Sequence, residues 1–101
     1  MIEKVEDKNP VNSYGLTPLH EAASNGHVEI CELIIENIAN KNPAANSGET
    51  PLHSAACFGH FDVCKLIIAN VANKHPVDNL GRTPKDMASS TDKRVIQLFE
   101  S

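Results

Sequence analysis

Apolar side chains recur at helical spacing in two segments of this chain. The apolar positions are Ile30, Leu33 and Ile34 in the first segment, then Val63, Leu66 and Ile67 in the second. Their i, i+3, i+4 spacing predicts one amphipathic helix in each segment, because such residues share one side of a helix. We expect the first of these helices to begin near His27 and the second near His60.

A shorter helix is predicted before each amphipathic one. Thr17 and Thr50 are suited to cap a helix through the hydroxyl group, and each precedes a proline, which fits the first helical position. Gly26 and Gly59 predict where these helices end, because glycine readily adopts the left-handed conformation after a last helical turn. Each unit therefore reads as two consecutive helices.

The helix pairs belong to a sequence repeat of 33 residues. Thr17-Pro18-Leu19-His20 returns as Thr50-Pro51-Leu52-His53 and, in altered form, as Thr83-Pro84-Lys85-Asp86. This period predicts stacked units that contact only their neighbours. We treat residues 1–101 as a single domain, with the divisions 1–11 (partial repeat), 12–44 (repeat one), 45–77 (repeat two) and 78–101 (repeat three, a C-terminal cap).

These motifs resemble those of the ankyrin repeat family. The family's T-P-L-H-x-A signature spans 17–22 and 50–55, and its glycine-histidine pair is present as Gly26-His27 and Gly59-His60. The resemblance implies an all-α solenoid of stacked antiparallel helix pairs with short β-hairpin turns. It also gives His20 and His53 a structural role, as hydrogen-bond partners of the backbone near the turns.

The chain departs from the family pattern after each second helix. Ile38-Ala39-Asn40 and Val71-Ala72-Asn73 stand where the family usually has Gly-Ala-Asp. Ile38 and Val71 continue the apolar stripes, and β-branched residues are poor left-handed caps. We therefore expect both helices to run about one turn further, to Asn40 and Asn73.

The two ends of the array differ. Repeat three has Asp92-Lys93 in place of the glycine-histidine pair and keeps an apolar side, which suits a terminal cap. No matching cap precedes repeat one, so Ile30 and Leu33 would have only residues 1–11 beside them. Two interpretations remain open: the chain is the end of a longer array, or it is a short protein that hides this N-terminal face by self-association or fraying.

Composition narrows the classes of function. The net charge is -4 and no basic stripe is present, so we expect no nucleic acid partner. No apolar run is long enough to span a membrane, so we do not expect a membrane as a partner. We interpret Cys31 and Cys64 as small buried hydrophobes in a reducing compartment, so the expected location is the cytoplasm or the nucleus.

Catalytic and metal-binding motifs are weak. Cys57 and His60 have a C-x-x-H spacing, but no second pair of ligands is evident, and zinc needs about four. The sequence has neither a nucleophile elbow nor a phosphate-binding glycine loop. We expect no cofactor, no metal and no enzymatic activity.

The resemblance implies a protein-binding module that uses a concave surface of hairpin tips and first helices. By repeat position, the candidate binding residues are Tyr14, Leu16, Asn25, Glu49, Phe58, Leu80, Arg82 and Met87. For Phe58 and Leu80 the alternative is that they cover neighbouring repeats. The alternative function is a structural C-terminal segment that caps a longer array and has no partner of its own.

Overall fold

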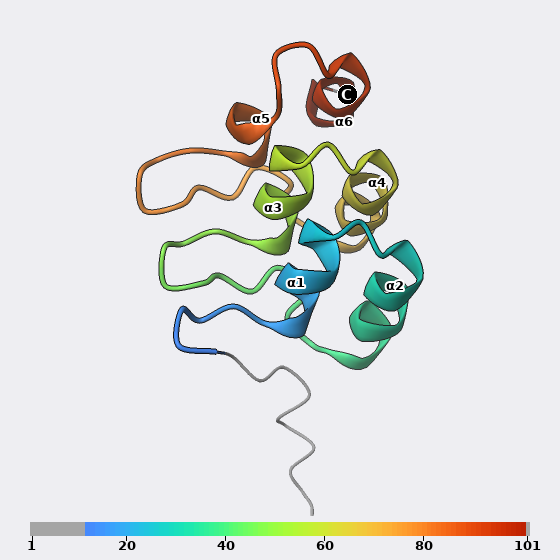
Figure 1. The fold of residues 1–101 in the computed structure, drawn as a ribbon, viewed down its shortest axis with the longest axis vertical. Coiled ribbons are helices and arrows are strands. Elements are labelled where there is room, and N and C mark those ends of the chain that lie inside the picture. Colours follow the sequence, from blue (N-terminus) through green and yellow to red (C-terminus); the bar gives the residue numbers. More distant parts are fainter. Residues whose placement is uncertain (1–11, 101) are drawn as a thin grey trace, which may run out of the picture.

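The computed structural model describes residues 12–100, and helices are the only secondary-structure elements in that range (Figure 1). The helices are α1 (Pro18–Ser24), α2 (Val28–Asn37), α3 (Pro51–Cys57), α4 (Phe61–Asn70), α5 (Pro84–Met87) and α6 (Lys93–Glu100). They form three consecutive pairs. No helix within residues 12–100 combines the length and the apolarity that crossing a bilayer demands.

The first helix of every pair begins with the same capping arrangement. The Thr17 side chain accepts a hydrogen bond from the His20 backbone N–H, and the Thr17 backbone N–H donates to the His20 ring. Thr50 and Thr83 make equivalent bonds at α3 and α5. These reciprocal bonds satisfy N–H groups that have no partner inside the helix. The predicted threonine caps and the proline in the first turn are thus confirmed.

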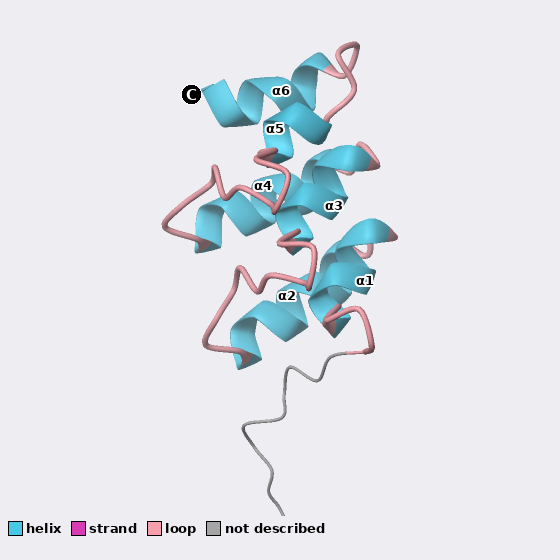
Figure 2. Cartoon of the chain, turned by 90° about the vertical axis from the view of Figure 1, so that its left-hand side faces the viewer, coloured by secondary structure: helices cyan, strands magenta, loops and turns pink. Residues whose placement is uncertain are grey.

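The helices form two layers along the stack. Helices α1, α3 and α5 lie beside the projecting loops, and α2, α4 and α6 form the second layer (Figures 1 and 2). Contacts run from α1 to α3 to α5 and from α2 to α4 to α6. Leu19 and Leu52 are fully buried between the layers, together with paired alanines that allow close helix approach. The expected all-α solenoid of stacked helix pairs is confirmed for residues 12–100.

The loops between pairs turn as hairpins, although no strand is present in residues 12–100. In the loop between α2 and α3 the Ala45 N–H donates to the Glu49 carbonyl at 2.8 Å, and the Gly48 N–H donates to the Ala45 carbonyl at 2.8 Å. The first helices end as predicted, since Gly26 and Gly59 both have positive φ angles, 72° and 73°.

The predicted extension of the second helices is wrong. Helix α2 ends at Asn37 and α4 at Asn70; Ile38 follows with φ −121° and ψ 150°, and Val71 with φ −121° and ψ 149°. The Asn37 side-chain amide donates to the Leu33 carbonyl at 2.7 Å, so the side chain satisfies an acceptor of the last turn. Ile38 still buries its side chain. The apolar stripe therefore predicted the burial of Ile38 correctly, but not its backbone conformation.

The segment between the two helices of repeat three is one residue shorter than the 33-residue period predicts. Helix α6 begins at Lys93, which is 32 positions after Phe61, the first residue of α4. Asp92 therefore takes the place of His60, and the expected match of Asp92-Lys93 to the glycine-histidine pair is wrong by one position. Val95 and Phe99 are buried against repeat two. The predicted partial repeat 1–11 lies outside the described residues, and the repeat divisions stay predictions.

Candidate protein-interaction surface

Neighbouring hairpin tips are joined by asparagine side chains and backbone bonds. The Asn46 N–H donates to the Tyr14 carbonyl (2.9 Å), and its side-chain amide donates to the Ser13 carbonyl (3.1 Å). Asn79 repeats this one period later, with bonds to the Ser47 and Asn46 carbonyls (2.8 and 2.9 Å). The sequence signal for these bonds is the recurrence of asparagine at positions 46 and 79, one period apart. The tips are thus held in a fixed arrangement.

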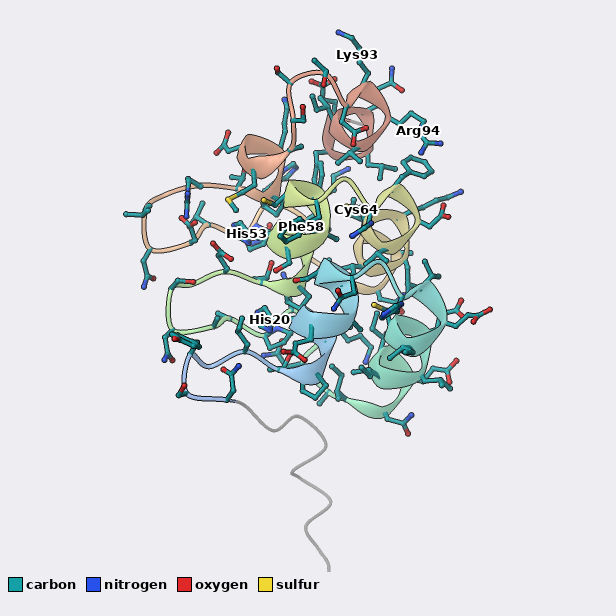
Figure 3. All side chains as sticks on the ribbon, in the orientation of Figure 1. His20, His53, Phe58, Cys64, Lys93 and Arg94 are labelled. Atoms are coloured by element: carbon teal, nitrogen blue, oxygen red, sulfur yellow. The ribbon has the colours of Figure 1, made fainter. Side chains whose placement is uncertain are left out.

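Buried histidines join the helices to the next hairpin, as the resemblance implied. His20 Nδ1 accepts from the Thr17 N–H (3.1 Å), so Nε2 carries the proton and donates to the Glu49 carbonyl (2.7 Å). Burial lowers the pKa of His20, and the bond to the Glu49 carbonyl only partly opposes this. His53 bonds likewise to the Thr50 N–H and the Arg82 carbonyl (3.1 and 2.8 Å). Figure 3 shows His20 and His53 in neighbouring repeats. These rings join each first helix to the hairpin of the next repeat.

Two of the candidate binding residues, Arg82 and Glu49, form ion pairs within the chain. Arg82 Nε donates to the buried Asp78 carboxylate at 2.8 Å, and the Arg82 guanidinium lies 3.6 Å from the Glu49 carboxylate. Burial opposes ionisation of Asp78, yet the hydrogen bonds from Arg82 and Leu80 outweigh it and lower its pKa. This ion pair across two hairpins was not foreseen. Arg82 and Glu49 stiffen the surface, with Arg82 still partly exposed.

Three candidate residues present large apolar groups to solvent. Tyr14 is 71% exposed, Phe58 63% and Leu80 75%. Tyr14 and Leu80 lie in the first and third hairpins. Phe58 directly follows α3 and is labelled in Figure 3. Aromatic residues such as Tyr14 and Phe58 are enriched where protein interfaces bury area. We call these three residues the recognition rim.

The remaining candidates are less prominent. Leu16 and Met87 are half-buried, and the Asn25 side-chain amide donates to the Glu21 carbonyl at 2.8 Å. They lie along the same hairpins and first helices as the recognition rim, so the structure brings the predicted set onto neighbouring elements. Their part in binding stays a prediction.

The cysteines are arranged as packing residues. Cys31 and Cys64 are fully buried, and burial raises their thiol pKa values to about 11 and about 12; for Cys64 the Asp92 carboxylate adds to this. Thiols with such values are poor nucleophiles at neutral pH. Cys57 is exposed beside Phe58. Within residues 12–100, no three histidine, cysteine or acidic side chains are grouped in a way that could hold a metal ion.

The comparison with protein families agrees with this geometry. A family model of ankyrin repeats in three copies matches residues 1–78 and, in an overlapping match, residues 36–99. The chain belongs to the ankyrin repeat family. Ankyrin repeats generally act as protein-interaction modules, and the helix pairs, glycine ends and histidine bonds described above form such a scaffold. No curated protein matches the chain.

Proposed function

We propose that this ankyrin domain is a non-catalytic protein-binding module that docks its partner on the recognition rim. The observation that carries the proposal is the exposure of Tyr14, Phe58 and Leu80 on a backbone fixed by the asparagine and histidine bonds. A surface that is already ordered loses little conformational freedom when it binds. The Asp78–Arg82–Glu49 contacts contribute rigidity to the same region.

Cys31, Cys57 and Cys64 are free thiols, which supports a location in a reducing compartment, and we propose the cytoplasm or the nucleus. The partner of this surface is another protein rather than nucleic acid, because the chain's net charge of -4 would repel phosphate groups.

The alternative is a structural segment that caps a longer array. Helix α6 favours it, because Val95 and Phe99 are buried on one side while Lys93, Arg94 and Glu100 lie toward solvent. A capping segment needs this amphipathic form but needs no partner of its own. Both functions are compatible with the fold, so only a binding experiment distinguishes them.

The test is capture of a partner on the immobilised full chain from an extract of the source cells, with variants compared side by side. Phe58→Ala, Tyr14→Ala and Leu80→Ala should leave the fold unchanged, since these side chains are exposed. Loss of an anchor weakens binding by about 2 kcal/mol, which is roughly thirtyfold in Kd. Leu33→Ala is the matched control, because Leu33 is similarly exposed but lies on α2.

A protein retained by the unmodified chain and by Leu33→Ala, but lost from Phe58→Ala, supports the proposal. Equal retention by all three rim variants would show that the surface is misassigned. If no protein is retained specifically, the capping role is the better account.

A further inference from the structure

Helix α2 carries a second exposed surface, which we call the N-terminal face. It consists of His27, Ile30 and Leu33, with Glu29, Glu32 and Glu36 beside them. Ile30 is 48% exposed and Leu33 62%. This surface is separate from the recognition rim, so a partner bound on it is independent of the proposed function.

Equivalent positions in the other repeats are covered by a helix. Ile30 is the third residue of α2, Val63 the third of α4 and Val95 the third of α6. Val63 and Val95 are both fully buried, since α4 packs on α2 and α6 packs on α4. The N-terminal face thus occupies a position at which, twice in this chain, a preceding helix lies.

Polar contacts between consecutive repeats also indicate that a helix would fit on the N-terminal face. His60 Nε2 lies 2.9 Å from the Ser24 carbonyl of the preceding repeat, and the ring of its counterpart His27 has no hydrogen-bond partner among residues 12–100. Arg94 lies over the Phe61 ring of the preceding repeat, 4.4 Å from its centroid. Its counterpart is Glu29, the second residue of α2. An occupant would therefore find a hydrogen-bonding ring and a carboxylate at these two positions.

The charge of the face decides which occupant fits. Helix α2 contains three glutamates and no basic residue, and these glutamates form no ion pair within the described part of the chain. A hollow of about 400 Å³ beside Ile30 is lined by Glu29 and by Asp62 of α4. A second copy docked through the same face would bring two sets of glutamates together, which is unfavourable. Basic side chains on the occupant would pair with them.

We propose that the N-terminal face docks an amphipathic helix of a partner protein. The apolar residues of that helix contact Ile30 and Leu33, and lysine or arginine residues on its flanks pair with Glu29, Glu32 and Glu36. The charge pairing selects this partner against a second copy of the chain.

The probe is a copy of the full chain with Glu29→Lys, Glu32→Lys and Glu36→Lys, which presents the same apolar pair flanked by bases. It is mixed with the unmodified chain at low salt, and association is measured by sedimentation equilibrium after circular dichroism has shown that both are folded. We expect a heterodimer at least about tenfold tighter than either homodimer, weakening as salt rises. If the triple variant is unfolded, Glu32→Lys with Glu36→Lys serves as the probe.

Matched leucine variants of the unmodified chain locate the contact. Leu33→Asp should abolish the heterodimer, and Leu80→Asp, at an exposed leucine on the recognition rim, should leave it intact. The proposal is overturned if folded probe and unmodified chain do not associate, or if Leu33→Asp has no effect. Equally tight self-association of the unmodified chain would make a second copy the occupant. A heterodimer that forms only after removal of residues 1–11 would make that segment the occupant.

Discussion

Repeats one and two have the same local structure but different surroundings. Their capping threonines Thr17 and Thr50 have φ, ψ angles of −97°, 168° and −101°, 167°, and their helices have equal lengths. Yet Ile30 is 48% exposed, whereas Val63 at the same position is fully buried. Repeat two has a neighbour on both sides within the described residues, and repeat one has a neighbour on one side.

The difference shows that local conformation and burial have separate causes in this chain. Caps, prolines and glycines fix the conformation within each repeat, and the next repeat decides how much of its apolar surface is buried. Stability of such an array is a sum of terms within repeats and terms between them. Substitutions at equivalent positions of repeats one and two separate these terms.

The largest effect is expected at the isoleucine that comes last in each apolar stripe, Ile34 in repeat one and Ile67 in repeat two. Ile67→Ala removes a fully buried side chain and should lower the free energy of unfolding by about 3 kcal/mol. Ile34→Ala, at the same position of repeat one, should cost about 1 kcal/mol, because Ile34 is only partly buried. Urea unfolding of both variants measures the difference. Equal losses would show that the first repeat is covered as well as the second.

Next in size is the loss of a buried histidine between hairpins. His53→Ala leaves the Thr50 N–H and the Arg82 carbonyl without the ring, and this should cost about 2 kcal/mol. The midpoint of thermal unfolding reports it. A change within the error of the unmodified protein would mean that water replaces both bonds.

A smaller effect distinguishes the two histidines that precede the second helices. His60→Ala loses the bond to the Ser24 carbonyl and should cost about 1 kcal/mol. His27→Ala should change stability by less than about 0.5 kcal/mol, since its ring makes no equivalent bond within the described residues. Urea unfolding under identical conditions compares them. A larger loss for His27→Ala would reveal a partner of that ring.

The smallest expected effect is a dependence of stability on pH from His20. Burial lowers its pKa below the ordinary value of 6.5. As the pH falls below that value, the unfolded chain binds a proton at this residue before the folded chain does, so stability decreases. Urea unfolding at about pH 7.5 and about pH 5.5, on either side of the ordinary pKa, measures the decrease, which should be smaller in His20→Ala. If stability decreases as much in His20→Ala as in the unmodified protein, other titrating groups cause the pH dependence.

Much of the fold could be predicted from the sequence because particular residue types determine where a helix begins and ends. Thr17 and Gly26 mark the limits of α1 through a cap and a positive φ angle that few other residues provide. The end of α2 could not be predicted from periodicity. Ile38 fits the apolar stripe, but the bond from the Asn37 side chain satisfies a carbonyl of the last turn, and the chain continues in extended form.

The candidate binding surface was harder to predict from the sequence than the fold. Exposure of Phe58 and Leu80 depends on which repeat lies beside them, and the sequence left open whether they cover a neighbour. The contact of Arg82 with Glu49 joins two hairpins that are far apart in the chain. Such contacts follow from the stacking distance between hairpins, and no motif within one repeat encodes that distance.

Native-state amide hydrogen exchange of the full chain tests most directly whether neighbouring repeats, rather than helix sequence, determine stability. The amides of α4 (Phe61–Asn70) should exchange more slowly than those of α2 (Val28–Asn37), although the two helices have the same length and local geometry. Equal protection of α2 and α4 would contradict the account.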